Sequence, residues 1–262
     1  MGASGAGKSS LFNILAGRSR TRGNIVVDAD IRMDGVRIDP NKNVKVRTIF
    51  AFVAQEDALH EASTPRQALK FSARLRLPRS TTEKEIDDFV EVLIDQLGLS
   101  SCSDTIIGGE RKKEISGGEK KRVSIGVEMI SQPEIIFLDE PTSGLDSFAA
   151  KEVMKLLQKL ANAGTIVLFI IHQPSSDIFA TFDSLILLNQ GRLMYKGVAS
   201  TINDDFAQLG YPIAPNYNPA DWILVSCFVF VLYIRGRLDY LSVLNATVFT
   251  VCGTNGKHGY TV

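Results

Sequence analysis

The chain opens with a glycine-rich loop that ends in a lysine and a serine. The pattern GxxxxGKS is made of Gly2, Ala3, Ser4, Gly5, Ala6, Gly7, Lys8 and Ser9, and Ser10 follows it. Glycines at this spacing let backbone N–H groups curl around phosphates, and the lysine adds a positive charge. The Ser9 hydroxyl is placed to ligate Mg²⁺, and the helix that follows points its positive end at the phosphates. A glycine-rich turn with a chance lysine is the plainer alternative, but a helix-forming stretch follows where a phosphate loop requires one.

Two acidic residues end an apolar run. The segment 135–138 reads as a strand buried on both faces of a parallel sheet, and Asp139 and Glu140 follow it directly. An aspartate there can hold Mg²⁺ through water, and the glutamate can orient an attacking water as general base. A solvated acidic turn is the alternative, but it leaves the apolar strand unexplained.

Two more polar residues follow short apolar strands and could reach the same phosphates. Gln55 comes after the run 49–53 and could contact Mg²⁺ or the attacking water. His172 comes after the run 165–171, where a neutral imidazole could touch a γ-phosphate. Either residue alone is a weak signal, because such glutamines are mostly solvated and single histidines are mostly structural.

A serine–glycine–glycine run opens a further helix. It consists of Ser116, Gly117, Gly118 and Glu119. Ser116 and Glu119 fit a capping box, and the glycines leave bare N–H groups at a positive helix end. This makes an anion site without a lysine. A simple helix cap is the alternative for this run taken alone.

The amino-acid composition is that of an ordinary globular protein. The chain has 262 residues, of which 45% are hydrophobic, and 29 basic residues balance 29 acidic ones. Balanced charge gives no argument for a nucleic-acid partner. The three cysteines (Cys102, Cys227 and Cys252) form no metal or disulfide pattern and fit a reducing compartment. Met1 runs directly into the glycine loop without a signal peptide, and the longest apolar run, 222–234, is too short to cross a bilayer unaided.

The elements that must position these residues alternate between strand and helix. Helical patterns cover 9–15, 64–77, 83–97, the stretch from 116 toward 131, and 147–160; the segments 25–38 and 184–195 read as hairpins. In 83–97, apolar residues fall on one face at helical spacing. Together with the strands at 49–53, 135–138 and 165–171, this alternation predicts a three-layer α/β fold. The stretch from about 225 onward loses the alternation and gives no structural prediction.

In their order and spacing, these motifs and the run 143–146 resemble the ATP-binding cassette of ABC transporters, over about residues 2–223. Several stretches, including 71–78, 122–126, 171–176, 195–197 and 218–221, resemble the eukaryotic G (White) subfamily, as does Glu119 where most ABC proteins have Gln. The resemblance implies a P-loop NTPase three-layer fold. It would have a mostly parallel core sheet, an antiparallel β subdomain and a helical signature subdomain.

In that family two cassettes pair head to tail, and hydrolysis drives export of lipids, sterols or hydrophobic xenobiotics. By this resemblance Lys8, Ser9, Gln55 and Asp139 would hold Mg-ATP, Glu140 would be the base and His172 the γ-phosphate sensor. Residues 116–119 would serve the partner's nucleotide, and Asp146 would line the seam between the two sites. The implied partners are a second cassette, identical or different, and a transmembrane domain, with the cassette on the cytoplasmic face of a membrane.

The sequence departs from that family at both ends. No strand precedes the phosphate loop, no aromatic residue is present to stack on adenine, and the stretch 224–262 is unfamiliar. We therefore expect a cassette over 1–223, lacking its N-terminal strands, a divergent tail over 224–262, and weak or no ATPase activity from this chain alone. Two alternatives stay open: a soluble ABC ATPase outside transport, and a cassette fragment that binds a partner without hydrolysing ATP.

Overall fold

The centre of the fold is a sheet in which three strands run parallel. A computed structural model describes residues 6–19, 21, 25–43, 46, 48–108, 114–189, 191–214, 217–226, 231–232 and 247–253. In it β3 (Phe50–Val53), β4 (Ile135–Asp139) and β5 (Ile166–Ile171) lie in that order, and β8 (Val231–Leu232) pairs antiparallel with β5. The parallel strands therefore end at one edge of the sheet, where the polar residues that follow them can meet.

Both faces of this sheet are covered, which explains why its strands are apolar throughout. On one face of the sheet, Ile135 and Phe137 of β4 pack against α1 (Lys8–Leu15), whose Phe12 is fully buried. On the opposite face, Ile136 and Leu138 of β4 share a core with α6 (Ser147–Asn162). Alternate residues of each strand thus serve different cores, as strand geometry requires.

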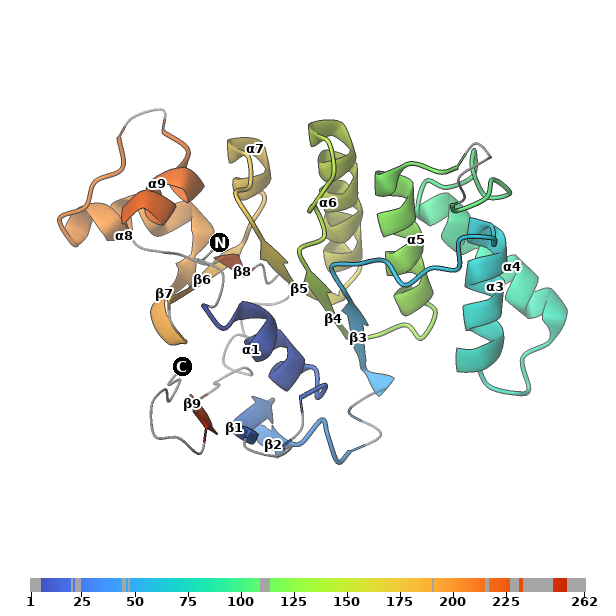
Figure 1. Cartoon of the computed structure of the whole chain (residues 1–262), viewed down its shortest axis with the longest axis horizontal. Helices are drawn as coiled ribbons and strands as arrows, with labels where there is room; N and C mark the ends of the chain where they lie inside the picture. Colours follow the sequence, from blue (N-terminus) through green and yellow to red (C-terminus); the bar gives the residue numbers. More distant parts are fainter. Residues whose placement is uncertain are drawn as a thin grey trace.

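An antiparallel sheet lies beyond α1 (Figure 1). It contains β1 (Ile25–Met33), β2 (Val36–Ile38) and β9 (Thr247–Gly253), with β1 in the middle. The turn between β1 and β2 places Asp34 and Gly35 at φ 51° and 75°, the backbone of a tight hairpin turn that Asp-Gly favours. The hairpin predicted over 25–38 is confirmed. In β9, part of the tail that gave no prediction is seen to pair with β1.

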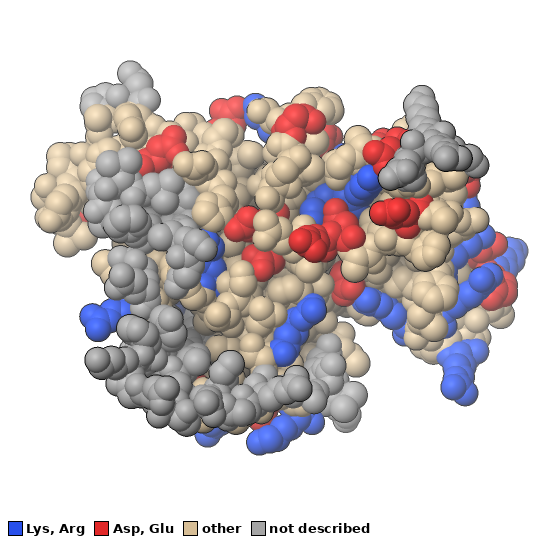
Figure 2. Space-filling view, viewed as in Figure 1, with Lys and Arg blue, Asp and Glu red and all other residues tan. Residues whose placement is uncertain are grey.

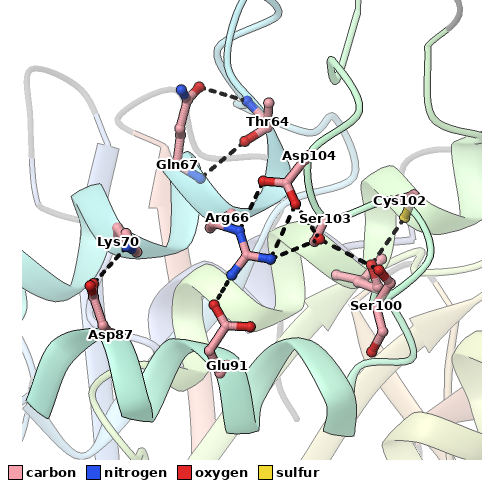
Figure 3. A network of polar contacts seen from close by, with 11 residues as sticks. Thr64, Arg66, Gln67, Lys70, Asp87, Glu91, Ser100, Cys102, Ser103 and Asp104 are labelled. Atoms are coloured by element: carbon pink, nitrogen blue, oxygen red, sulfur yellow. Dashed lines mark hydrogen bonds and ion pairs between the residues drawn. The ribbon is translucent and has the colours of Figure 1, made fainter. Parts of the chain in front are cut away.

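Three helices form a separate group at the far side of the sheet from β8 (Figure 1). They are α3 (Pro65–Arg76), α4 (Glu83–Gln96) and α5 (Gly117–Met129), and each begins with a capping box. Figure 3 shows Arg66 of α3 joining this group together: its guanidinium contacts Glu91 of α4 and, at 2.9 Å, Asp104 of the loop before α5. The helical subdomain is therefore cross-tied by ion pairs as well as by its apolar core.

The remaining described elements lie beside β5 and β8. They are α7 (Ser176–Phe179), β6 (Ser184–Asn189), β7 (Arg192–Val198), the 3₁₀ turn η1 (Ala199–Thr201), α8 (Ile202–Gln208) and α9 (Pro219–Ser226). The strands β6 and β7 form the predicted hairpin, and β8 contacts β6 as well as β5. None of the helices in the described part of the chain combines the length and apolar character that a membrane crossing requires. The predicted fold class is confirmed, whereas the boundary at residue 223 stays a prediction.

Candidate functional site

The described half of the phosphate loop leads directly into α1. Gly7 has φ +90°, a backbone conformation that residues with a Cβ rarely adopt. Lys8 begins the helix. The carbonyl of Ala6 accepts a hydrogen bond from the N–H of Gly191 at 3.1 Å, which ties the loop to the β6–β7 turn. Ser9 and Ser10 are exposed at the start of α1. The remaining predicted loop residues, Gly2, Ala3, Ser4 and Gly5, lie outside the described residues.

Lys8 and His172 meet although 164 positions separate them in the chain. The Lys8 Nζ lies 2.9 Å from the His172 Nε2. An ammonium group can only donate, so this Nε2 accepts, and the imidazole is neutral with its proton on Nδ1. The pKa of His172 agrees: partial burial lowers it, and the Lys8 charge lowers it further against the opposite pull of Glu140. A neutral imidazole at the end of β5 is what the sequence predicts.

Glu140 lies beside both groups. Its Oε1 is 3.4 Å from the His172 Nε2, and its Oε2 accepts a hydrogen bond from the Gln55 Nε2 at 3.1 Å. Because the imidazole is neutral, the first contact is not an ion pair. Gln55 also reaches the Ser143 hydroxyl at 3.4 Å. The structure thus gathers residues from the ends of β3, β4 and β5 around the start of α1.

The backbone at these strand ends adopts an uncommon conformation. Glu140 has φ +48° and Gln173, the residue after His172, has φ +40°. Non-glycine residues rarely occupy this region, and such backbone strain concentrates at functional sites. The conformation turns the chain sharply at the end of β4 and of β5, which brings Glu140 and His172 to the same edge.

Charge at this edge is partly compensated. Only 9% of Lys8 is exposed, and burial lowers the pKa of its ammonium, while Glu140 and Asp139 act in the opposite direction. The Oδ1 of Asp139 is buried and accepts no hydrogen bond from the described residues. We call Lys8, Gln55, Asp139, Glu140 and His172 the strand-end cluster.

An unpartnered carboxylate oxygen suits a hard cation such as Mg²⁺, which prefers oxygen ligands and usually keeps several waters. Asp139 can provide that oxygen, Gln55 an amide oxygen and Ser9 a hydroxyl. No group of three His, Cys, Asp or Glu side chains in the described ranges could hold a metal ion by itself. The donor set therefore fits a Mg²⁺ ion that also binds phosphate oxygens, not a metal held by protein ligands alone.

The run 116–119 forms a separate, self-contained cap on α5. The Ser116 N–H and hydroxyl donate to the Glu119 Oε2 at 2.7 and 2.8 Å, and the Glu119 N–H donates back to the Ser116 Oγ at 3.3 Å. This is the predicted capping box. We call residues 116–119 the signature cap; these hydrogen bonds close within the cap, and among the described residues none joins it to the phosphate loop.

The two glycines of the signature cap are also required by close packing against Leu145 and α6. A Cβ added at Gly118 would lie 2.8 Å from the Ala149 Cβ of α6, and one at Gly117 would lie 3.3 Å from a Leu145 methyl group. The Gly118 contact is too close for any side chain unless a helix moves. The glycines therefore let α5 approach α6, in addition to leaving N–H groups bare.

Several contacts at these sites were not predicted from the sequence. Ser143 hydrogen-bonds to Gln55, and the buried Lys121 contacts the segment that carries Gln55. Cys102, which no sequence pattern singled out, lies next to Glu119; burial and this carboxylate raise the pKa of its thiol to about 11. The run 143–146 gave a signal for Ser143, whereas Lys121 and Cys102 gave none.

Two family models match the chain. The model described as ABC transporter matches residues 1–143, and the model described as ABC-2 type transporter matches residues 172–228. The first match covers more than half of the chain and includes the phosphate loop, the signature cap and the strand-end residues of β3 and β4.

Individual relatives agree with these models. The chain is 44% identical to ABC transporter G family member 13 of Arabidopsis thaliana over 227 residues, which are 86% of this chain and 32% of the relative. It is 41% identical to the broad substrate specificity ATP-binding cassette transporter ABCG2 of Rattus norvegicus over 224 residues, again 86% of this chain and 33% of the relative. This chain thus spans about a third of the length of these relatives.

A solved structure shows the same architecture. The chain superimposes on cbiO1 from Clostridium perfringens, part of the ABC transporter complex cbiONQ, with a TM-score of 0.62 and 28% identity over 80% of this chain and 78% of the other. All of these similar proteins are named as transporters or transporter parts, which does not favour the two alternatives outside transport. The chain therefore belongs to the ABC transporter family, carries its ATP-binding cassette, and is similar to G-subfamily members, as the sequence motifs predict.

Proposed function

We propose that this chain binds Mg-ATP at the strand-end cluster and, when paired with a second cassette and joined to a transmembrane domain, hydrolyses it to power the export of a lipid, sterol or hydrophobic xenobiotic. The observation that carries the proposal is the convergence of Lys8, Glu140, His172 and Gln55 from four separate segments. Such a cluster gives a cation for phosphate, a carboxylate for water and a neutral imidazole at one sheet edge. A solvated turn or a structural histidine alone explains none of these contacts.

The roles of the cluster residues follow from their chemistry. Lys8 would hold the β- and γ-phosphates, together with the N–H groups of the phosphate loop. Glu140 would take the proton from the attacking water, and Gln55 would hold that water against the carboxylate. His172, neutral because burial and Lys8 lower its pKa, can donate from Nδ1 or accept at Nε2 without adding charge.

The metal site belongs to the same proposal. Ser9, Gln55 and Asp139 would hold Mg²⁺, whose bound charge neutralises the phosphate oxygens. Asp139 supports this assignment because its buried Oδ1 has no hydrogen-bond donor among the described residues. Burying such an oxygen without a partner is costly, which favours a cation there when nucleotide is bound.

The signature cap implies a second cassette. Its first helical turn leaves N–H groups without intrahelical acceptors, and the helix end favours an anion. Because it lies on α5, away from the described part of the phosphate loop, we propose that it binds the nucleotide held by a partner cassette. The partner is a second copy or a related chain, arranged head to tail, and Asp146, which caps α6, would lie near the seam.

A groove in the helical subdomain supports the second proposed partner, a transmembrane domain. It has a volume of about 630 Å³ and is lined mainly by residues 58–76. Phe71 and Leu75 of α3 stand beside it with 66% and 70% of their surface exposed. Apolar side chains exposed together commonly mark interaction sites. We therefore assign this groove to a membrane domain, with the cassette on the cytoplasmic face.

The proposed activity is tested by comparing the full-length gene product with its Glu140→Gln variant. If Glu140 is the base, hydrolysis should fall by about 10²–10⁴-fold while ATP is still bound. The measurement is phosphate release together with equilibrium binding of ATP. Hydrolysis that survives in Glu140→Gln would show that another group is the base.

A further inference from the structure

Lys121 is a lysine buried inside the helical subdomain. Only 2% of its surface is exposed, although it lies on α5 two positions after Glu119. A buried ammonium group is stable only if hydrogen-bond acceptors or an opposite charge replace its water. Its neighbour Lys120 has the ordinary surface arrangement, since 29% of its side chain is exposed and it pairs with Glu114 at 3.0 Å.

Within the described part of the chain, the hydrogen bonds and the ion pair of the Lys121 ammonium all go to one short segment, residues 54–57. Its Nζ lies 2.9 Å from the carbonyl oxygen of Gln55, 3.4 Å from that of Ala54 and 2.7 Å from the Asp57 Oδ1. The two carbonyl oxygens accept hydrogen bonds from the ammonium group, and the Asp57 carboxylate adds an ion pair that compensates its buried charge. Lys121 therefore connects α5 with the chain just after β3.

That segment carries Gln55, whose side chain faces Glu140. Residues 54–60 form no helix or strand, so regular backbone pairing does not fix the place of Gln55. On one side its carbonyl is held by Lys121, and on the other its amide donates to the Glu140 Oε2 at 3.1 Å. The two contacts form a continuous path from α5 to the proposed base.

We propose that Lys121 is a positioning residue, which fixes Gln55 against Glu140 and makes the geometry of this chain's own cluster depend on the position of α5. The inference rests on the proposed function, because it assigns hydrolysis to Glu140 and the partner's nucleotide to the signature cap. Since that cap begins the same helix, binding of the partner's nucleotide and placement of Gln55 are coupled through one ammonium group. The ion pairs of Arg66 hold α3, α4 and the loop before α5 together, so a shift of α5 can move Gln55 without disrupting the rest of the helical subdomain.

The test uses Lys121→Met in the full-length gene product, with Lys120→Met as the matched control on the same helix. Loss of the contact should displace Gln55, and misplacing a catalytic group by about 1 Å can cost on the order of 10²-fold in rate. We expect kcat to fall by about tenfold or more while the KM for Mg-ATP changes little. Lys120→Met should leave both constants unchanged. A kcat for Lys121→Met equal to that of wild type would overturn the inference.

A double variant separates positioning from general damage to the fold. If Lys121 acts through Gln55, adding Lys121→Met to Gln55→Ala should cause no further loss of kcat. Independent, multiplicative losses would contradict the proposal. Amide hydrogen exchange without nucleotide gives a second readout: residues 54–58 should exchange faster in Lys121→Met, and unchanged exchange there would also count against it.

Removing a buried charge can destabilise the chain, so a milder variant is included. Asp57→Asn keeps the ammonium and both carbonyl contacts and should lower kcat less than Lys121→Met, with the same small change in KM. An Asp57→Asn variant with wild-type kcat and wild-type exchange would contradict the proposal even if Lys121→Met does not fold. If wild type itself shows no hydrolysis, the proposed function fails instead, and the exchange experiment still decides whether Lys121 fixes this segment.

Discussion

The strand-end cluster and the signature cap are the two proposed phosphate sites, but they are assembled in opposite ways. The cluster joins residues up to 164 positions apart, so it exists only when the whole sheet is folded. The cap closes its hydrogen bonds within three positions, from Ser116 to Glu119. A site made by tertiary structure and a site made by local sequence should therefore respond differently to substitution.

They also differ in charge. In the cluster, Lys8, Glu140 and His172 already contact one another, so a nucleotide has to replace existing interactions. In the cap, the helix supplies only partial charge, and the carboxylate of Glu119 is held by Ser116. We therefore expect the cluster to hold Mg-ATP by its own charges, and the cap only to add to a nucleotide held elsewhere.

Among the variants that separate the two regions, the largest effect on ATP binding is expected from Lys8→Ala, which breaks the cluster and leaves the cap intact. Without the ammonium, ATP affinity should fall by at least about tenfold, or ~1.4 kcal/mol. The pKa of His172 should also rise, because a positive neighbour that lowers it is gone; burial should still hold it below the ordinary value. Calorimetric ATP titration and an NMR pH titration of His172 measure the two effects. Unchanged ATP affinity would argue against the phosphate-loop assignment.

A smaller, more selective effect is expected where the helical subdomain meets its proposed membrane partner. Replacing Phe71 and Leu75 by serine should reduce substrate-stimulated hydrolysis and transport, because the exposed apolar surface that they provide is lost. Basal hydrolysis should stay unchanged, since neither residue contacts the cluster. Transport into vesicles is the readout, and Val92→Ser, another exposed apolar residue on α4, is the control. Full stimulation in the double variant would exclude this groove as the docking site.

The cap is tested through its packing. Gly118→Ala would place a Cβ 2.8 Å from the Ala149 Cβ, and overpacking of this kind costs about 1–3 kcal/mol. The midpoint of urea unfolding should fall accordingly. Gly117→Ala should cost less, because its nearest neighbour is a Leu145 methyl at 3.3 Å that can move. Adding Ala149→Gly should restore the stability of Gly118→Ala, and failure to do so would show that α6 is not the cause.

The smallest effect concerns Cys102 beside the cap. Burial and the Glu119 carboxylate raise the pKa of its thiol to about 11, so at pH 8 the thiol is protonated. Because the thiolate is the reactive form, Cys102 should resist thiol reagents in the folded protein and react only on unfolding. The rate of modification is measured in a variant with serine at Cys227 and Cys252. Rapid modification of the folded protein at pH 8 would contradict the environment described.

Much of this arrangement could be predicted from the sequence, because local patterns carry it. The apolar face of α4, with Ile86 and Val90 buried, follows from helical spacing, and the capping box at Ser116 follows from residue type and position. The strand-end residues were predicted because an apolar run followed by a polar residue is typical of a parallel strand and its active edge.

The remaining features depend on three-dimensional contacts between residues far apart in the chain, which the spacing of residues along the sequence does not encode. No pattern shows that Lys8 meets His172, that Gly118 makes room for Ala149, or that Lys121 is buried against Gln55. A lysine two positions after Glu119 looks the same in sequence whether solvated or buried. The pairing of β9 with β1 is another long-range contact that the tail sequence did not indicate.

The central claim is that cluster and cap meet only across two cassettes, around a nucleotide that the cluster holds. It is tested most directly by the mass of Glu140→Gln in light scattering with and without Mg-ATP, alongside the double variant Glu140→Gln, Ser116→Arg. We predict an ATP-dependent dimer for the first protein and a monomer for the second, which still binds ATP through its intact cluster. If Glu140→Gln stays monomeric with ATP bound, or if the Ser116→Arg double variant dimerises equally well, the claim is wrong.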